Sequence, residues 1–244
     1  MIENKYDNDA FFEKYSHFPR SVHGLSAAGE WPALQKLLPV FVGKRILDLG
    51  CGFGWHCQYA AEHGAEYVLG IDVSEKMLEV ACRKNRFCNV EYRRSAIENI
   101  SFAPDSFDIV ISSLALHYVK DFRSVCQKVA QILPAGGCFV FSVEHPVFTA
   151  AGPQDWSYDE TGAKCHWPVD RYFSEGKRNA VFLGETVTKY HRTLTTYFTA
   201  LLSAGFQITT VVEPQPTADM LKNIEEMKDE LRRPMMLLIS AVKR

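Results

Sequence analysis

The stretch Lys44–Ala61, KRILDLGCGFGWHCQYAA, contains the pattern that decides the fold. Its first part, Arg45–Leu49, is short and mostly apolar, which is typical of a strand buried on both faces of a parallel sheet. Three glycines follow at alternate positions, Gly50, Gly52 and Gly54. The next residues, Trp55–Ala61, can continue as a helix. A glycine turn between a strand and a helix lets backbone amides approach a ligand closely, so we expect a ligand site at the carboxyl end of this strand.

The composition is that of an ordinary globular protein. With 244 residues, 47% hydrophobic and 23% charged, the chain can bury a sizeable core in one α/β domain with an excursion, or in two small domains. A formal net charge of −2 argues against a protein that holds long nucleic acids. No apolar run approaches the roughly 20 residues that span a bilayer, and the segment MIENKYDNDAFFEKY is unlike a signal peptide. These features predict a cytoplasmic protein.

The seven cysteines do not form a metal-binding pattern. Their number is odd, and they include no Cys-x-x-Cys pair and no Cys/His cluster at zinc spacing. We therefore expect no metal site, and we expect buried, reduced thiols.

Strands alternate with helices after the opening unit. The expected strands are Tyr67–Val73, Val90–Arg93, Phe107–Ser112 and Cys138–Val143. The expected helices between them are Met77–Cys82, with Ser74 as its N-cap, and Phe122–Leu133. This alternation implies right-handed βαβ units and a parallel sheet. The chain then ends with a helix at Thr193–Ala204, a strand at Gln207–Val212, a helical stretch at Asp219–Arg233 and a strand at Met235–Val242.

This order divides the chain into four segments. Residues 1–42 are helical, residues 43–145 form the core with the glycine turn, residues 146–190 form an aromatic-rich cap, and residues 191–244 complete the sheet. Two interpretations of the first segment stay open: a packing helix that covers the first strand, or a lid from which Tyr15 or Arg20 reaches the ligand. The cap is too long for a structureless loop, so we expect a hairpin or small subdomain within it.

The glycine spacing separates two classes of cofactor. Dinucleotide-binding turns follow G-x-G-x-x-G, but here the third glycine comes one residue early and Trp55 takes its place. Asp48, on the strand itself, is ill-suited to an anionic pyrophosphate and suits an ammonium group. Asp72, 18 residues past Gly54, can accept hydrogen bonds from a ribose diol. A ligand with one cationic end and one ribose, such as S-adenosylmethionine, fits these residues better than a nicotinamide dinucleotide.

Four motifs in register resemble those of the class I S-adenosylmethionine-dependent methyltransferases, of the small-molecule, domain 11-like type. They are DLGCGFG at 48–54, GIDVS at 70–74, SFDIVISSLALHYV at 106–119 and LPAGG at 133–137. The resemblance covers residues 45–145 and makes them the S-adenosylmethionine-binding core. It implies a Rossmann-like, doubly wound sheet of seven strands in the order 3-2-1-4-5-7-6, with strand 7 antiparallel and helices on both faces.

The resemblance also implies which residues hold the donor. They are Asp48, Gly50 and Ser113 at the methionine end, Gly52 and Gly54 in the turn, Asp72 at the ribose with Val73 beside it, and Met77, Ala96 and Ile97 at the adenine. Many relatives carry an acid where Ser95 stands; a hydroxyl there can also accept from the adenine amino group. S-adenosylhomocysteine would be the product.

Methyl transfer from a sulfonium is an in-line displacement in which the leaving group needs no proton. A general base is needed only where the acceptor must lose a proton. Four candidates follow strands four and five or precede the last long helix: His117, Glu144, His145 and His191. The sequence does not choose among them.

The acceptor is expected to be a small organic molecule. Enzymes that methylate exocyclic amino groups of bases show Asn/Asp-Pro-Pro-aromatic after strand four, where this chain has Ser112–Ala115, and the Pro-Cys of cytosine C5 methylases is absent. The cap at 146–190 would then close over the acceptor, or serve instead as a structural cap or dimer contact. We expect a monomer or weak homodimer with no nucleic-acid or membrane partner. Alternatives are a protein that binds S-adenosylmethionine without transferring its methyl group and, less favoured, an NAD-dependent oxidoreductase.

Overall fold

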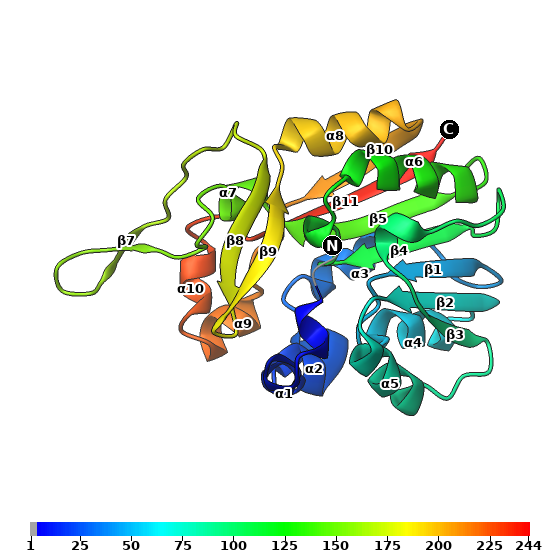
Figure 1. Cartoon of the computed structure of the whole chain (residues 1–244), viewed down its shortest axis with the longest axis horizontal. Coiled ribbons are helices and arrows are strands. Elements are labelled where there is room, and N and C mark those ends of the chain that lie inside the picture. The colour runs from blue at the N-terminus through cyan, green and yellow to red at the C-terminus, as the bar shows by residue number, and fades with distance from the viewer. Residues whose placement is uncertain (1–3) are drawn as a thin grey trace.

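A seven-stranded sheet organises the computed structural model, which describes residues 4–244 (Figure 1). The strands lie in the order β3-β2-β1-β4-β5-β11-β10, and β11 runs antiparallel to both of its neighbours. They are β1 (Arg45–Leu49), β2 (Tyr67–Asp72), β3 (Val90–Arg94), β4 (Ile109–Ser113), β5 (Cys138–Glu144), β10 (Phe206–Val212) and β11 (Met236–Lys243). Because β10 and β11 are the sixth and seventh strands of this sheet, the predicted order 3-2-1-4-5-7-6 is confirmed.

Helices cover both faces of the sheet, as Figure 1 shows. They are α4 (Trp55–Glu62) and α5 (Glu75–Lys84) on one face, and α6 (Phe122–Ile132) and α8 (Leu194–Ser203) on the other. Side chains of β1 alternate between the faces, with Leu47 in the core cluster of α6 and Ile46 in that of α4. Asp48 therefore points to the same face as Ile46, beneath α4.

The N-terminal segment, from residue 4 onward, is mostly helical. It contains η1 (Lys5–Asp7), α1 (Asp9–Ser16), α2 (Pro19–His23), η2 (Gly24–Ala27) and α3 (Trp31–Leu37). Leu34 of α3 packs against Val140 of β5 and Leu238 of β11, and Phe41, beyond the helix, packs on Ile46 of β1. The helix thus covers β5 and β11 rather than the first strand. Residues 1–3 of this predicted segment lie outside the described residues.

The stretch between β5 and α8 carries its own small elements. They are α7 (Pro146–Thr149), the paired strands β6 (Ser157–Tyr158) and β7 (Lys164–His166), and the hairpin of β8 (Gly176–Phe182) with β9 (Glu185–His191). The guanidinium of Arg233 lies 4.3 Å from the ring centroid of Trp167, which itself stacks on Phe148 at 4.9 Å. Cation–π and aromatic contacts thus fasten this stretch to the C-terminal part of the chain.

Four shorter helical elements complete the fold, and one prediction needs correcting. η3 (Ile97–Asn99) and η4 (Leu116–Tyr118) follow β3 and β4. The helical stretch predicted at Asp219–Arg233 is two short helices, α9 (Ala218–Asn223) and α10 (Met227–Glu230). Neither buries a residue fully, so apolar packing does not extend them into one helix.

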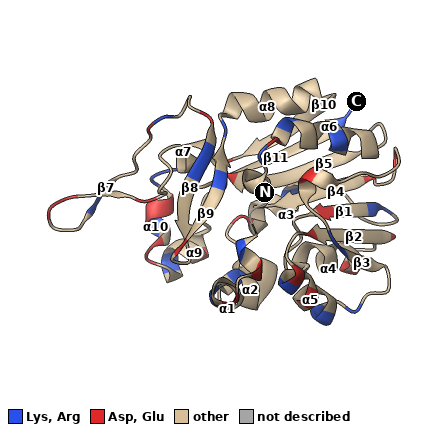
Figure 2. Cartoon of the chain, in the orientation of Figure 1, with Lys and Arg blue, Asp and Glu red and all other residues tan. Residues whose placement is uncertain are grey.

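The cysteines and charges are distributed without a dominant cluster. All seven thiols are free, but the prediction that they are buried is wrong for Cys82, Cys88 and Cys165, which are exposed. Cys82 lies on the solvent face of α5, and the other two lie in a loop and in the exposed strand β7. Acidic and basic residues are interspersed along the chain (Figure 2). Within residues 4–244, no helix is long and apolar enough to cross a membrane, and no group of three or more potential ligands could hold a metal ion.

Candidate active site

The glycine turn between β1 and α4 depends on backbone conformations that favour glycine. Gly50, Gly52 and Gly54 have φ angles of 76°, 53° and 75°. A Cβ at Gly50 would lie 2.4 Å from Cβ of Ala115, and one at Gly54 would lie 2.2 Å from the hydroxyl of Tyr92. At Gly52 no atom lies within 4 Å of that position. The outer two glycines therefore let the turn pack closely, and Gly52 leaves an open face for a ligand.

Asp72 at the end of β2 fixes this turn from the side. Its Oδ2 accepts a hydrogen bond from the Gly52 amide at 2.9 Å, and its Oδ1 accepts one from the Ser74 amide at 2.9 Å. Ser74 in turn caps α5, since its hydroxyl accepts from the Met77 amide at 3.1 Å. Burial raises the pKa of the Asp72 carboxyl. A carboxylate has about four acceptor positions, so the two oxygens can accept further hydrogen bonds from a ligand.

Asp48 lies beneath the turn. Its Oδ2 accepts from the Cys57 thiol at 3.4 Å, and its Oδ1 is buried with no hydrogen-bond partner among the described residues. Burial raises the pKa of this carboxyl to about 7. A buried carboxylate oxygen without a partner is costly unless positive charge lies nearby, which fits a ligand with an ammonium group.

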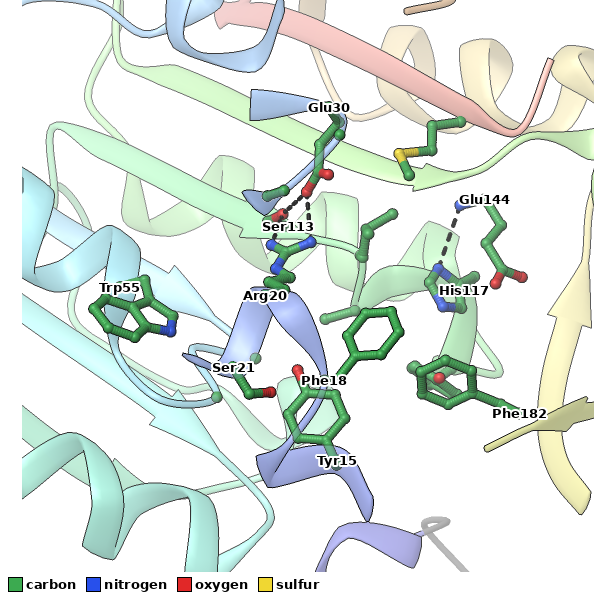
Figure 3. A pocket seen from close by; sticks show the side chains of 18 of the residues that line it. Tyr15, Phe18, Arg20, Ser21, Glu30, Trp55, Ser113, His117, Glu144 and Phe182 are labelled. Carbon is green, nitrogen blue, oxygen red and sulfur yellow. Dashed lines mark hydrogen bonds and ion pairs between the residues drawn. The ribbon is translucent and has the colours of Figure 1, made fainter. Parts of the chain in front are cut away.

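A cavity of about 470 Å³ opens beside the turn (Figure 3). It extends over the carboxyl ends of β4 and β5 to the start of β11. Of the ten residues predicted to hold the donor, seven line it: Gly50, Gly52, Asp72, Val73, Met77, Ile97 and Ser113. Asp48, Gly54 and Ala96 are not part of its lining. Ser95 lines it and donates its hydroxyl to the carbonyl of Ala96 at 3.2 Å.

The N-terminal segment forms one side of the cavity, with Tyr15 and Arg20 both in its lining. The Arg20 guanidinium donates to Glu30 Oε1 at 2.6 Å and to the Ser113 hydroxyl at 2.8 Å. Ser113 also donates to Glu30 Oε1 at 3.1 Å. Glu30 is only 1% exposed, so this cluster ties α2 and the start of α3 to the tip of β4 away from water. Figure 3 shows Arg20 between Glu30 and the open part of the pocket.

Two of the four candidate bases lie away from the cavity. In His145, Nδ1 accepts a hydrogen bond from the Val147 amide at 3.0 Å, and Nε2 lies 2.8 Å from Glu213 Oε1. In His191, Nδ1 lies 2.7 Å from the Thr149 hydroxyl, and Nε2 lies 2.8 Å from the carbonyl oxygen of Tyr172. The His145 ring therefore links the start of α7 to the residue after β10, whereas the His191 ring joins β9 to other parts of the cap.

His117 and Glu144 do line the cavity. Nδ1 of His117 accepts from the Glu144 amide at 3.4 Å, and burial lowers the pKa of the imidazole to about 4. The carboxylate of Glu144 accepts from Lys189 at 2.5 Å and from Gln154 at 2.6 Å. Burial acts to raise the pKa of Glu144, but the neighbouring His117 and Lys189 and these hydrogen bonds bring it below its usual value. The imidazole is thus neutral and the carboxylate ionised near neutral pH.

Part of the lining was not predicted from the sequence. It includes Phe182, Val187 and Lys189 of the β8–β9 hairpin, and Met220, Met227, Met235 and Met236 near the C-terminus. The position of Met235 and Met236 at the cavity could have been predicted, because an antiparallel seventh strand begins at the edge of the sheet where the parallel strands end. The hairpin residues carry only the alternation of a half-buried strand, which does not point to a cavity.

Comparisons with known proteins agree with this geometry. Residues 47–141 match the sequence profile of the methyltransferase domain family. A solved S-adenosylmethionine-dependent methyltransferase of Mesorhizobium loti is 48% identical, covering 90% of this chain and 100% of that one, with a TM-score of 0.84. A Listeria monocytogenes protein assigned to the same class is 61% identical, covering 91% of this chain and 99% of that one, with a TM-score of 0.86.

A curated relative adds a more distant comparison. The ubiquinone biosynthesis O-methyltransferase of Neisseria meningitidis is 35% identical over 129 residues, which span 47% of this chain and 54% of that enzyme. The two full-length structural matches, at 61% and 48% identity, carry the assignment. The chain belongs to the S-adenosylmethionine-dependent methyltransferases, enzymes that transfer the methyl group of this cofactor.

Proposed function

We propose that this enzyme methylates a small molecule by in-line displacement. The observation that supports the proposal is a single cavity, which runs from the glycine turn to His117 and Glu144 and is bordered by the N-terminal segment and the β8–β9 hairpin. Its volume, about 470 Å³, lies within the range of roughly 300–1,000 Å³ that small-molecule sites occupy. A side chain or base of a macromolecule would have to enter between these two covering segments.

The donor would occupy the half of the cavity beside the glycine turn. Asp72 would accept hydrogen bonds from the ribose hydroxyls, and Met77 and Ile97 would border the adenine. The open face at Gly52 would admit the methionine portion, close to the backbone at Ser113. Asp48 would act from beneath the turn through its charge, as it is absent from the lining.

The acceptor would occupy the other half, over the ends of β4 and β5. When bound, S-adenosylmethionine supplies a methyl group on a sulfonium, which leaves without needing a proton. The protein's part is therefore to align the acceptor and to exclude water. Phe18 from the N-terminal segment, and Phe182 and Val187 from the hairpin, place apolar surface around this half.

The proposal assigns a role to each of the four predicted segments. The core at 43–145 would hold the donor, residues 191–244 complete the sheet, and the segments at 1–42 and 146–190 would act as lid and cap. The proposed oligomeric state is a monomer or weak homodimer. The ubiquinone biosynthesis O-methyltransferase acts, by its name, in making a small molecule, which agrees with a small acceptor here.

An acceptor screen tests the proposal. The full-length protein would be incubated with S-adenosylmethionine and panels of phenols, carboxylic acids, amines and thiols, with bulk RNA and a protein mixture as further acceptors. We expect release of S-adenosylhomocysteine with one small-molecule class, and much slower release with the Asp72→Ala variant at a subsaturating cofactor concentration. Turnover confined to RNA or protein would overturn the small-molecule proposal.

A further inference from the structure

The acceptor half of the cavity has one polar end, formed by His117, Glu144 and Lys189. Lys189 belongs to β9 and is 3% exposed, whereas Glu144 closes β5. Their ion pair, 2.5 Å between Nζ and Oε1, links the hairpin to the sheet at the cavity wall. The hydrogen bonds of these three side chains decide what kind of atom can bind beside them.

His117 presents a hydrogen-bond donor to the cavity. Its Nδ1 accepts from the Glu144 amide, so in the neutral ring the proton resides on Nε2. The low pKa described above keeps the ring neutral. Since Nδ1 faces the backbone of Glu144, Nε2 on the opposite side of the ring is left for the cavity that His117 lines (Figure 3). In this tautomer His117 donates to an acceptor and does not remove a proton from it.

Glu144 is not available as a base either. One carboxylate oxygen accepts from Lys189 and the other from Gln154 at 2.6 Å. Glu230, the other acid on this side of the lining, accepts from Arg233 with both oxygens, at 2.6 and 2.9 Å. Each of these carboxylates is thus matched to a cationic partner from the protein, which removes their attraction for a cationic substrate.

Lys189 keeps one donor for a ligand. Its ammonium has three N–H groups, and the described residues engage two of them, at Glu144 Oε1 and at Gln154 Oε1, 2.9 Å away. Most of the other side chains in this half of the lining are apolar or polarisable, with Phe182 and Val187 on the hairpin and Met220, Met227 and Met236 opposite. Methionine walls adapt to flat or irregular apolar bodies.

We propose that the methyl acceptor is an ionised oxygen, a phenolate or carboxylate carried on an apolar body, held by Nε2–H of His117 and by Lys189. This inference rests on the proposed function and specifies its substrate class. In the reaction, an oxygen lone pair forms the new O–CH₃ bond as the C–S bond breaks, and the pair from that bond stays on sulfur. The negative charge of the oxygen and the positive charge of the sulfonium cancel, so no proton has to be removed.

An amine acceptor fits these contacts poorly. A neutral amine has a single lone pair, and accepting a hydrogen bond from His117 would occupy the electrons needed for attack. An ionised oxygen can accept from both His117 and Lys189 and still direct a lone pair at the methyl group. A protonated amine would find no carboxylate free to pair with it, because Glu144 and Glu230 already accept from Lys189 and Arg233.

Binding of two matched probes to the full-length protein, preloaded with S-adenosylhomocysteine, tests the inference. The probes are 4-nitrophenol, whose anion absorbs visible light, and 4-nitrobenzylamine, which has a similar body and a cationic end. We expect the protein to bind nitrophenol as its anion, seen as saturable growth of the phenolate absorbance at fixed pH, and to bind the amine at least about tenfold more weakly.

Variants separate the named contacts from general packing. His117→Asn keeps an acceptor for the Glu144 amide but removes the donor at Nε2, and should weaken phenolate binding roughly tenfold or more. His117→Gln places an amide donor near Nε2 and should restore part of that loss. Lys189→Met combined with Glu144→Gln, which leaves no buried charge unpaired, should also weaken it. Lys177→Met removes an exposed ammonium from β8 and should change nothing.

The outcomes distinguish a failure of the oxygen-acceptor inference from a failure of the proposed function. Tighter binding of the amine, or binding of neither probe while S-adenosylhomocysteine still binds, would overturn the oxygen acceptor and leave methyl transfer standing. Equal phenolate affinity in wild type and His117→Asn would overturn the assigned contact. Turnover confined to RNA or protein in the acceptor screen would instead defeat the proposed function.

Discussion

The ionisation of Asp48 is coupled to folding near neutral pH. Its carboxyl has a pKa of about 7 in the folded chain, against an ordinary value of 3.8, because it is buried. Between these pH values the native state holds a proton that the unfolded chain has released, so raising the pH favours unfolding. The contribution of the Asp48 proton to the free energy of unfolding is on the order of 4 kcal/mol. It is fully present below the ordinary pKa and is lost as the pH rises through about 7.

The Asp48→Asn variant isolates this effect. We expect its free energy of unfolding, measured with urea at about pH 5 and about pH 8, to fall less with rising pH than that of the wild type. Burial lowers the pKa of His56 and of His117, which gives the opposite slope below neutrality in both proteins. The difference between the two proteins therefore reports Asp48. Parallel pH profiles would show that Asp48 ionises normally in the fold.

At the scale of elements, the cluster of Arg20, Glu30 and Ser113 holds the N-terminal segment against the end of β4. Replacing Arg20 by Met leaves the Glu30 carboxylate, 1% exposed, without its cationic partner. Removing one member of a buried ion pair costs about 3–5 kcal/mol. We expect Arg20→Met to lower the free energy of urea unfolding by this order, and the double variant Arg20→Met/Glu30→Gln to be the more stable of the two.

The matched control is Arg93→Met on β3. Its salt bridge to Glu91 lies at the surface with both side chains half exposed, so its loss should cost about 1 kcal/mol or less. If the single Arg20 variant were as stable as the double variant, another group would offset the charge of the Glu30 carboxylate. The cluster would then not be what holds the N-terminal segment against the end of β4.

The elements nearest the glycine turn were the most predictable. The strand, the turn and the cap at Ser74 depend on residues within a few positions of one another, so their spacing carries the information. Lys189 meets Glu144 across 45 positions of sequence, which no local pattern reveals. Local patterns were also insufficient for the four candidate bases. Each follows or precedes a sheet element, but only side-chain packing decides that His145 and His191 lie away from the cavity.

On the scale of the whole molecule, the proposed donor site spans elements that are far apart in sequence, so ligand binding should stabilise the fold as a unit. A ligand that binds only the native state, present at 100 times its dissociation constant, adds about 2.7 kcal/mol to the free energy of unfolding. We expect S-adenosylhomocysteine to do this and to raise the midpoint of urea unfolding, and we expect NAD at the same concentration to leave it unchanged.

The Asp72→Ala variant connects this stabilisation to the named site. Asp72 accepts from the Gly52 and Ser74 amides, so its loss removes both the proposed ribose acceptor and the support of the turn. Charge-assisted hydrogen bonds contribute about 1.5–3 kcal/mol, which would weaken binding by roughly tenfold to a hundredfold. At the wild-type ligand concentration the variant should therefore keep only about 0.4–1.4 kcal/mol of the stabilisation by S-adenosylhomocysteine. Full stabilisation of the variant would place the ribose elsewhere, and stabilisation of the wild type by NAD would mean that the cavity also accepts a dinucleotide.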